Sequence, residues 1–385
     1  MASSHQLPSE LWMEIFRWAT GSYEVEGYRI DYEPFARLPL HTDVHELLSV
    51  RRVLVLVCRR WQSLAMELLY SDLIIRNHSH ALHEALRRSG GEHGKRARRA
   101  ILPYAATVTP SCTPVTSTEI LNVCPSLQVL VRPPIVAPAR ELLRFEFEAG
   151  RCPNLQSLRR LEWWHHPEAS RTKGINKLED VLLCAPNLEH LFIGGIPSYS
   201  PSYQQSLHLA ALKTLRLRLG NGMYLFNVCK WSLPSLTTLI IDAPMGSGAL
   251  DTLFAAYGDQ LRTVELGKHL GFLASDSLAA CFQGCPNLEE LNCRIIFTAV
   301  CMRPGSSSLR SVGLFLDPIY HFEEVHEWMI IESHLQTFAN KTAFPSLATM
   351  RLLGRWPTMM LKPKWSSLYE SLINRGISIL IEPES

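Results

Sequence analysis

The sequence has little charge and no long apolar run. Charged residues make up 19% of its 385 residues and nearly cancel, to a net charge of +2, so no global field directs the chain toward nucleic acid or an anionic membrane. No run approaches the length of about 18 apolar residues that a membrane-spanning helix requires, and the first residues lack the pattern of a signal peptide. An apolar content of 46% combined with so little charge indicates a folded chain with a large core.

Catalytic and cofactor motifs are also missing. The sequence contains no Walker-type phosphate loop, no dinucleotide fingerprint and no nucleophile elbow, so we expect neither an enzyme nor a cofactor. Cys281, Cys285, Cys293 and Cys301 could suggest a zinc set. Cys285 and Cys293 occupy regular positions of the repeat described below, which favours packed structural thiols over a metal site. We interpret the ten cysteines as reduced thiols of a cytoplasmic or nuclear protein.

A helix with two apolar stripes is predicted near the N-terminus. The first stripe consists of Leu7, Leu11, Ile15 and Trp18. Trp12 and Phe16 form a second stripe beside it. Pro8 suits the first helical position, because its fixed φ fits and its missing N–H would be unpaired there anyway. Such a helix can pack on its own domain and offer its other face to a partner.

Three short motifs match a known family in type and order. Leu-Pro-x-Glu-Leu-x-x-x-Ile-Phe occupies residues 7–16, Val-Cys-Arg-Arg-Trp occupies residues 57–61, and Leu-Tyr follows at 69–70. Together they resemble the F-box, a three-helix module that docks on the Skp-type adaptor of an SCF-type cullin–RING ubiquitin ligase. The chain departs from the family at about residues 20–48, where a longer segment replaces the usual short link between helices one and two. We therefore expect an F-box-like helical module over residues 1–76 with an insertion.

The resemblance assigns roles to individual residues. The positions that would face the adaptor are Leu7, Pro8, Leu11, Val57, Cys58, Trp61 and Leu64. Ile15 and Phe16 are expected to fill the module's own core. The alternative is a small helical bundle with no docking role, since each amphipathic element alone is a common pattern.

Residues 77–117 are predicted to form a linker with a helix, a basic turn and a loop. The stretch 76–99 holds seven Lys and Arg residues against Glu84 and Glu92. This pattern fits an anion site or a nuclear localisation signal, but a solvated helix face explains it more simply. His78, His80 and His83 are expected to be surface residues, because no matching Cys or carboxylate set lies nearby.

Residues 118–385 contain an internal repeat. Pro-x-Leu recurs six times, and a Leu-x-x-Leu-x-Leu-like core occurs seven times. The first six cores begin at Leu188, Leu212, Leu236, Leu261, Leu288 and Leu309, which are 21 to 27 residues apart. This interval is typical of leucine-rich repeats. The next core begins at Leu347, and the longer gap before it predicts an inserted helix at 322–338.

The repeat predicts an α/β fold. Each Leu-x-Leu end is a short strand, the apolar segments before the prolines are returning helices, and stacked units share one core. The region resembles the leucine-rich repeats that follow an F-box in many substrate receptors, but it lacks their regular Asn or Cys position. We therefore expect an irregular solenoid with parallel strands on a concave face and helices on a convex face. A set of unrelated helices and strands is the alternative.

The strand face of such a solenoid is a natural protein-binding surface. Its predicted target-binding residues are Arg216, Arg218, Arg262, Glu265, Glu289, Glu290, Arg310, Phe315 and Arg351. The resulting hypothesis is a substrate-recognition adaptor, with partners comprising a Skp-type adaptor, through it cullin and RING subunits, and an unidentified protein target. A repeat scaffold that binds a partner without any ligase is the alternative. We expect no nucleic acid or membrane partner.

Overall fold

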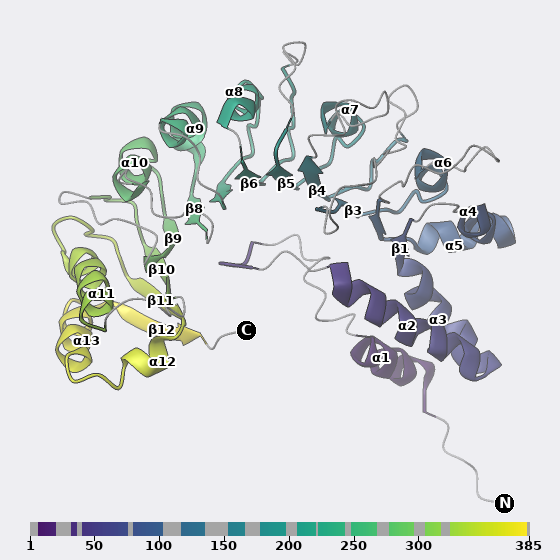
Figure 1. Cartoon of the computed structure of the whole chain (residues 1–385), viewed down its shortest axis with the longest axis horizontal. Coiled ribbons are helices and arrows are strands. Elements are labelled where there is room, and N and C mark those ends of the chain that lie inside the picture. The colour runs from purple at the N-terminus through teal and green to yellow at the C-terminus, as the bar shows by residue number, and fades with distance from the viewer. Residues whose placement is uncertain are drawn as a thin grey trace, which may run out of the picture. The chain divides into compact units, whose positions relative to one another are not determined.

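The computed structural model describes residues 7–20, 32–36, 41–75, 80–102, 117–134, 153–165, 178–197, 206–220, 222–242, 248–267, 277–295, 305–316 and 324–382. Its central feature is one twelve-stranded sheet in which the strands follow one another in sequence order from β1 to β12 (Figure 1). The strand pairs with a defined register are all parallel. This sequential parallel sheet, with a helix before most strands, is the solenoid-like α/β fold that the repeat predicts.

The strands are β1 (Asp72–Ile74), β2 (Arg99–Ile101), β3 (Val129–Arg132), β4 (Arg160–His165), β5 (His190–Gly195), β6 (Thr214–Leu219), β7 (Thr238–Ile241), β8 (Thr263–Leu266), β9 (Glu290–Arg294), β10 (Ser311–Leu316), β11 (Thr349–Gly354) and β12 (Ser378–Glu382). The helices are α1 (Ser9–Ala19), α2 (His41–Val57), α3 (Arg59–Ser71), α4 (His80–Arg87), α5 (Glu92–Arg96), α6 (Ser117–Asn122), α7 (Leu178–Leu183), α8 (Leu225–Val228), α9 (Ala249–Tyr257), α10 (Ser277–Gly284), α11 (Glu324–Ala339), α12 (Trp356–Met359) and α13 (Trp365–Asn374). The sheet begins at β1 and so extends further toward the N-terminus than the repeat pattern indicates. None of these helices combines the length and apolar character that crossing a membrane requires.

The chain divides into two compact units. Unit 1 comprises Met1–Asp31 and Ala36–Leu191, and unit 2 comprises Tyr32–Phe35 and Phe192–Ser385. The four residues Tyr32–Phe35 thus group with the C-terminal unit, although they lie between α1 and α2 in the sequence.

In unit 1, helices α1, α2 and α3 enclose a small apolar core. Its buried members are Phe16, Leu54, Ala65 and Leu68, and Trp12, Met13, Val55, Trp61 and Leu64 pack against them. The rings of Trp12 and Phe16 lie 5.0 Å and 4.9 Å from the Trp61 ring, centroid to centroid. These separations are typical of favourable aromatic pairs, so the second stripe of the N-terminal helix closes this core.

The sequence places Leu54, Val57, Trp61, Leu64 and Leu68 at a helical spacing, but a break between α2 and α3 lies among them. Cys58 has φ −160° and ψ 166°, which is extended backbone, and its Sγ accepts a hydrogen bond of 3.5 Å from the Trp61 N–H. Cys58 therefore caps α3. Because the helix is interrupted there, the apolar side chains before and after Cys58 do not share the single face that one continuous helix would give them.

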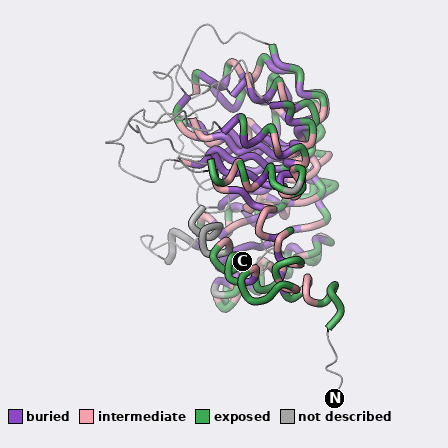
Figure 2. Tube along the Cα trace, turned by 90° about the vertical axis from the view of Figure 1, so that its right-hand side faces the viewer, coloured by how far each residue is buried: buried purple, intermediate pink, exposed green. Residues whose placement is uncertain are grey.

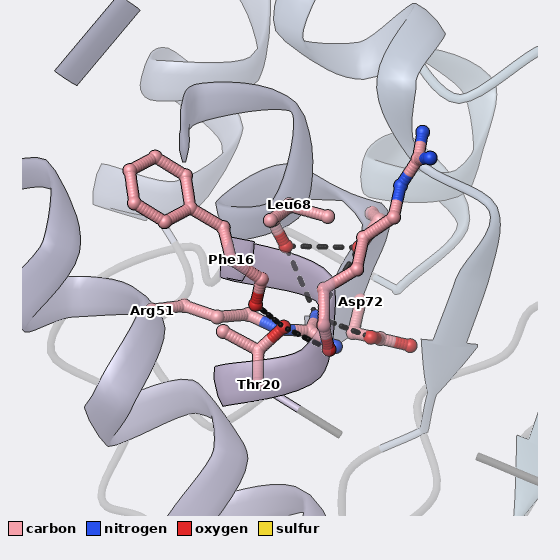
Figure 3. Close-up of polar contacts among 7 residues, drawn as sticks. Phe16, Thr20, Arg51, Leu68 and Asp72 are labelled. Carbon is pink, nitrogen blue, oxygen red and sulfur yellow. Dashed lines mark hydrogen bonds and ion pairs between the residues drawn. The ribbon is translucent and has the colours of Figure 1, made fainter. Parts of the chain in front are cut away.

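Arg51 joins the helices to the first strand (Figure 3). Its guanidinium extends from α2 and donates to the backbone oxygen of Leu68 at 3.0 Å and to the carboxylate of Asp72. Arg51 and Asp72 are only 1% and 5% exposed. The partly buried Leu48 of α2 also packs against the cluster of Ile101, Val129 and Val131 on strands β2 and β3. Helices α2 and α3 thus contact the start of the sheet in unit 1.

The repeat positions have the predicted burial. In all seven cores, from Leu188, Leu191 and Ile193 to Leu347, Met350 and Leu352, the three apolar side chains are buried. In unit 2, α8, α9 and α10 lie on the same side of strands β6 to β9 (Figure 1), and the stack of strands is largely buried (Figure 2). The predicted inserted helix is α11 (Glu324–Ala339), and the last helix and strand described are α13 and β12.

Polar side chains link neighbouring repeats at the turns before the strands. Asn187 donates to the backbone oxygen of Gln156 at 2.9 Å, and Asn287 donates to that of Asp259 at 2.8 Å. The hydroxyls of Ser235 and Ser308 make the same kind of bond, to Ala210 at 2.6 Å and Pro286 at 2.8 Å. Each bond satisfies a backbone carbonyl in the turn of the preceding repeat.

Candidate functional site: an apolar helix face and a polar strand face

The two apolar stripes of α1 have different environments. Phe16 is 1% exposed, whereas Leu7, Leu11, Ile15 and Trp18 are 40%, 48%, 43% and 68% exposed. Ile15 was expected in the core together with Phe16. That expectation is wrong, because Ile15 belongs to the stripe that faces solvent while the Trp12 and Phe16 stripe fills the core. In Figure 2 the first described segment after the N-terminus is mostly exposed. Large apolar side chains that are exposed together on one helix face are a common feature of interaction surfaces.

The start of α1 lies beside the junction of α2 and α3. The Arg60 guanidinium donates to the backbone oxygen of Leu7 at 2.7 Å. Val57 and Cys58, at this junction, are both exposed, and Val53 and Leu56 on α2 are 62% and 82% exposed. The structure therefore places four of the predicted adaptor-facing residues at the surface around one hydrogen bond: Leu7, Pro8, Val57 and Cys58. We call Leu7, Leu11, Ile15, Trp18, Val57 and Cys58 the apolar helix face.

Trp61 and Leu64 are placed differently from the other predicted adaptor-facing residues. Both are half-buried and pack against the Phe16, Leu54 and Leu68 core. Their main contacts are thus within the helical module, whereas Leu11 and Val57 of the predicted set are 48% and 53% exposed.

In unit 2, the side of the strands that faces away from the leucine core carries ordered rows of polar residues. We call it the strand face. The central row consists of Arg216, Ile240, Glu265, Asn292, Gly313 and Arg351, each aligned with the next by the parallel register. Because parallel strands keep these residues about 4.8 Å apart, side chains along a row can bond directly to one another.

Charged groups on this face are paired across strands. Arg216 donates to the Asp242 carboxylate at 2.8 Å. Arg351 forms an ion pair with Glu290 and donates to the side-chain oxygen of Asn292 at 3.4 Å. Asn292 in turn donates to Glu290 at 2.7 Å. This network fixes the orientation of the Asn292 amide, which is 0% exposed.

The predicted target-binding residues fall into two groups. Those that lie on strands β6 to β11 of the strand face are Arg216, Arg218, Glu265, Glu290, Phe315 and Arg351. Arg262, Glu289 and Arg310 lie in the turns just before strands, and the Arg262–Glu289 pair, at 3.5 Å, is half exposed on both sides. The second group thus forms an edge of the face rather than the face itself.

The contact that sequence reasoning missed is the segment Tyr32–Phe35, which is seated on this face. The Tyr32 hydroxyl donates to Glu265 at 2.9 Å and accepts from the Asn292 amide at 2.7 Å. The Phe35 backbone N–H donates to the same Glu265 oxygen at 2.8 Å. No sequence signal links residues that are more than two hundred positions apart, although Tyr, Pro and Phe in an otherwise unpatterned insertion are residues that favour recognition.

The Phe35 side chain completes the contact. Its ring lies 5.2 Å from the Phe315 ring, centroid to centroid, and the Arg294 guanidinium lies 4.0 Å from the Phe315 ring centroid and 5.6 Å from that of Phe35. Such cation–π and ring contacts are favourable when they are partly desolvated.

Burial changes the titration of the central groups. It raises the pKa of Glu265 above its ordinary value, although the Arg216 charge and the bonds from Phe35 and Tyr32 oppose the shift. Burial, followed by the charges of Glu265 and Glu290, raises the pKa of the Tyr32 hydroxyl well above its ordinary value. Tyr32 is therefore a neutral phenol that both donates and accepts.

Three of the four cysteines that could suggest a zinc set lie among the described residues, and these three are packed thiols. Cys281, Cys285 and Cys293 are 0% exposed, and the Cys285 contact together with burial raises the pKa of Cys281 well above its ordinary value. No group of three or more potential metal ligands occurs among the described residues, which exclude Cys301 and His78. Of the two surfaces described above, the apolar helix face offers apolar side chains and the strand face offers oriented polar and aromatic groups. No protein-family model matches this sequence, and no curated protein matches it significantly.

Proposed function

We propose that this protein is a substrate receptor of an SCF-type ubiquitin ligase. In this proposal, the α1–α3 module docks on a Skp-type adaptor through the apolar helix face, and the repeats hold a protein target. In this role the chain takes no part in the chemical step of ubiquitin transfer. It acts by proximity, because holding the target near a charged conjugating enzyme raises its effective concentration.

The exposure of one stripe of α1 is the observation that carries the proposal. The Trp12 and Phe16 stripe already closes the core of the module, so burial within the fold does not explain why Leu7, Leu11, Ile15 and Trp18 are apolar. The F-box motifs cover the same three helices, and two of their expected docking residues, Val57 and Cys58, are exposed beside the start of α1.

The described part of the insertion is compatible with such a module. Its residues Tyr32–Phe35 group with unit 2, whereas the apolar helix face belongs to α1 and the α2–α3 junction of unit 1. The contacts of Tyr32 and Phe35 are with residues of unit 2, none of which belongs to the apolar helix face.

The test is purification of the tagged chain from eukaryotic cells, with the adaptor, cullin and RING subunits scored together. The proposal expects all three at levels that depend on the apolar helix face. Recovery of partner proteins without any adaptor would support the ligase-independent scaffold instead and would refute the docking claim.

A further inference from the structure

The segment Tyr32–Phe35 is a short turn held on the strand face by both of its aromatic residues. It lies between two helices of unit 1 in the sequence but groups with unit 2. The contact residues on the strand face, Glu265, Asn292, Arg294 and Phe315, come from three consecutive strands, β8 to β10. A turn that only reversed the direction of the chain would not need contacts with three strands. Tyr32–Phe35 is therefore bound to the strand face in the way that a peptide ligand would be.

The site is specific for a tyrosine hydroxyl. Glu265 accepts from the hydroxyl and Asn292 donates to it, so both hydrogen-bonding roles of a neutral phenol are used. Asn292 is held in the donating orientation by Glu290 at 2.7 Å. A phenylalanine would leave the buried Glu265 and Asn292 groups without these partners. A phosphotyrosine would bring a dianion against two carboxylates, which is repulsive.

The site also selects a turn. Phe35 has φ 57°, in the left-handed region that residues with a large side chain rarely adopt. This backbone directs its N–H to Glu265 and its ring to Phe315 and Arg294. Pro34 precedes it and restricts the accessible conformations. Two aromatic side chains three positions apart thus reach the same face.

We propose that strands β8 to β10 form a recognition site for a turn-forming protein segment that carries an unmodified tyrosine and an aromatic residue three positions later. The chain's own Tyr32–Phe35 occupies this site until such a segment of a target displaces it. The inference rests on the proposed function in one respect, namely that the repeats bind the target, and it names the chemistry of that target.

A tethered segment is an effective competitor. Because the segment belongs to the same chain as the site, its effective concentration there is on the order of millimolar, and a free peptide of the same sequence must compete with it. For a peptide whose intrinsic Kd is about 0.1 mM, this competition weakens apparent binding about tenfold. Removal of the two aromatic side chains from the internal segment should therefore raise the affinity of the chain for the free peptide by about that factor.

The experiment uses the full chain and a fluorescein-labelled peptide with the sequence of residues 28–40. Binding by fluorescence anisotropy is compared among the wild type, Tyr32→Ala/Phe35→Ala, and that double variant combined with Phe315→Ala. We expect saturable binding that is about tenfold tighter in the double variant than in the wild type and that is lost when Phe315→Ala is added. The peptide with phosphotyrosine at the position of Tyr32 should bind at least about tenfold more weakly.

Equal affinity of the wild type and the double variant, or no saturable binding to the double variant, would overturn the inference. If the double variant fails a thermal unfolding check, Tyr32→Phe serves instead, because it removes only the hydroxyl; it should still bind the peptide more tightly than the wild type, and equality would again overturn the proposal. Retention of the adaptor is measured on the same proteins. Failed peptide binding with the adaptor retained refutes this inference alone, whereas peptide binding without any adaptor refutes the proposed ligase function alone.

Discussion

Deleting the same atoms from a core leucine and from an exposed leucine of the helical module should have very different effects on stability. Leu68 is 6% exposed within the Phe16, Leu54 and Ala65 core, whereas Leu11 is 48% exposed on α1. Leu→Ala in a packed core costs about 2–5 kcal/mol, because a cavity term adds to the transfer term. At Leu11 only about half of the transfer term applies and no cavity forms, so the expected cost is about 1 kcal/mol or less.

Hydrogen exchange in the full-length protein measures this difference locally. Peptides from α1 and α3 report the free energy of opening of the module. A difference of about 2 kcal/mol between Leu68→Ala and Leu11→Ala corresponds to exchange that is about 30-fold faster in the first variant. If Leu11→Ala accelerates exchange as much as Leu68→Ala does, the exposed stripe is in fact packed, and the reasoning about two faces fails.

Three further predictions concern buried polar contacts. Asp72→Ala should destabilise unit 1 by about 3–5 kcal/mol in urea unfolding, because it leaves Arg51 buried without its ion-pair partner, and Arg51→Met/Asp72→Leu should recover much of that loss; a cost below about 1 kcal/mol would contradict the pairing. The pKa of Glu265 is raised from 4.5 in the folded protein, so its contribution to stability is fully present below 4.5 and is lost as the pH rises through the raised value. Glu265→Gln should remove that part of the pH dependence, and an unchanged profile would argue against a buried carboxyl. Gly313→Ala should weaken unit 2 by about 1–3 kcal/mol, because a Cβ there would lie 2.0 Å from the Asn292 side-chain oxygen, and an unaffected thermal midpoint would refute that close approach.

The repeats could be predicted because their pattern is local and redundant. Pro-x-Leu and the three apolar positions of each core occur many times, and each copy predicts the same strand and turn, so irregular spacing did not obscure the fold. Burial of Cys293 as a core residue followed from its place in that pattern.

The side chains of the helical module were harder to assign. Helical spacing identifies two apolar stripes on α1, but it does not say which one faces the core, and so Ile15 and Trp61 differ from simple expectation. The break at Cys58 lies between residues that share a helical period, and its cap uses a weak sulfur acceptor that gives no clear sequence signal.

The contact between Tyr32–Phe35 and the strand face depends on tertiary structure alone. Its partners lie on three strands, and their juxtaposition follows from the sheet register rather than from any motif. The turn ladder formed by Asn187 and Asn287 could have been found from the sequence, since both residues occupy the middle position of Pro-Asn-Leu.

The central claim is tested most directly by the affinity of the purified chain for a purified Skp-type adaptor, measured by titration calorimetry. Leu7→Ala/Leu11→Ala should weaken binding at least about 30-fold, the loss expected when two central apolar contacts are truncated. The matched control is Leu183→Ala/Leu361→Ala, which removes the same atoms from leucines that are 62% and 84% exposed outside the apolar helix face; it should bind as the wild type does. Equal affinity of both double variants, or no binding of the wild type to the adaptor, would contradict the account.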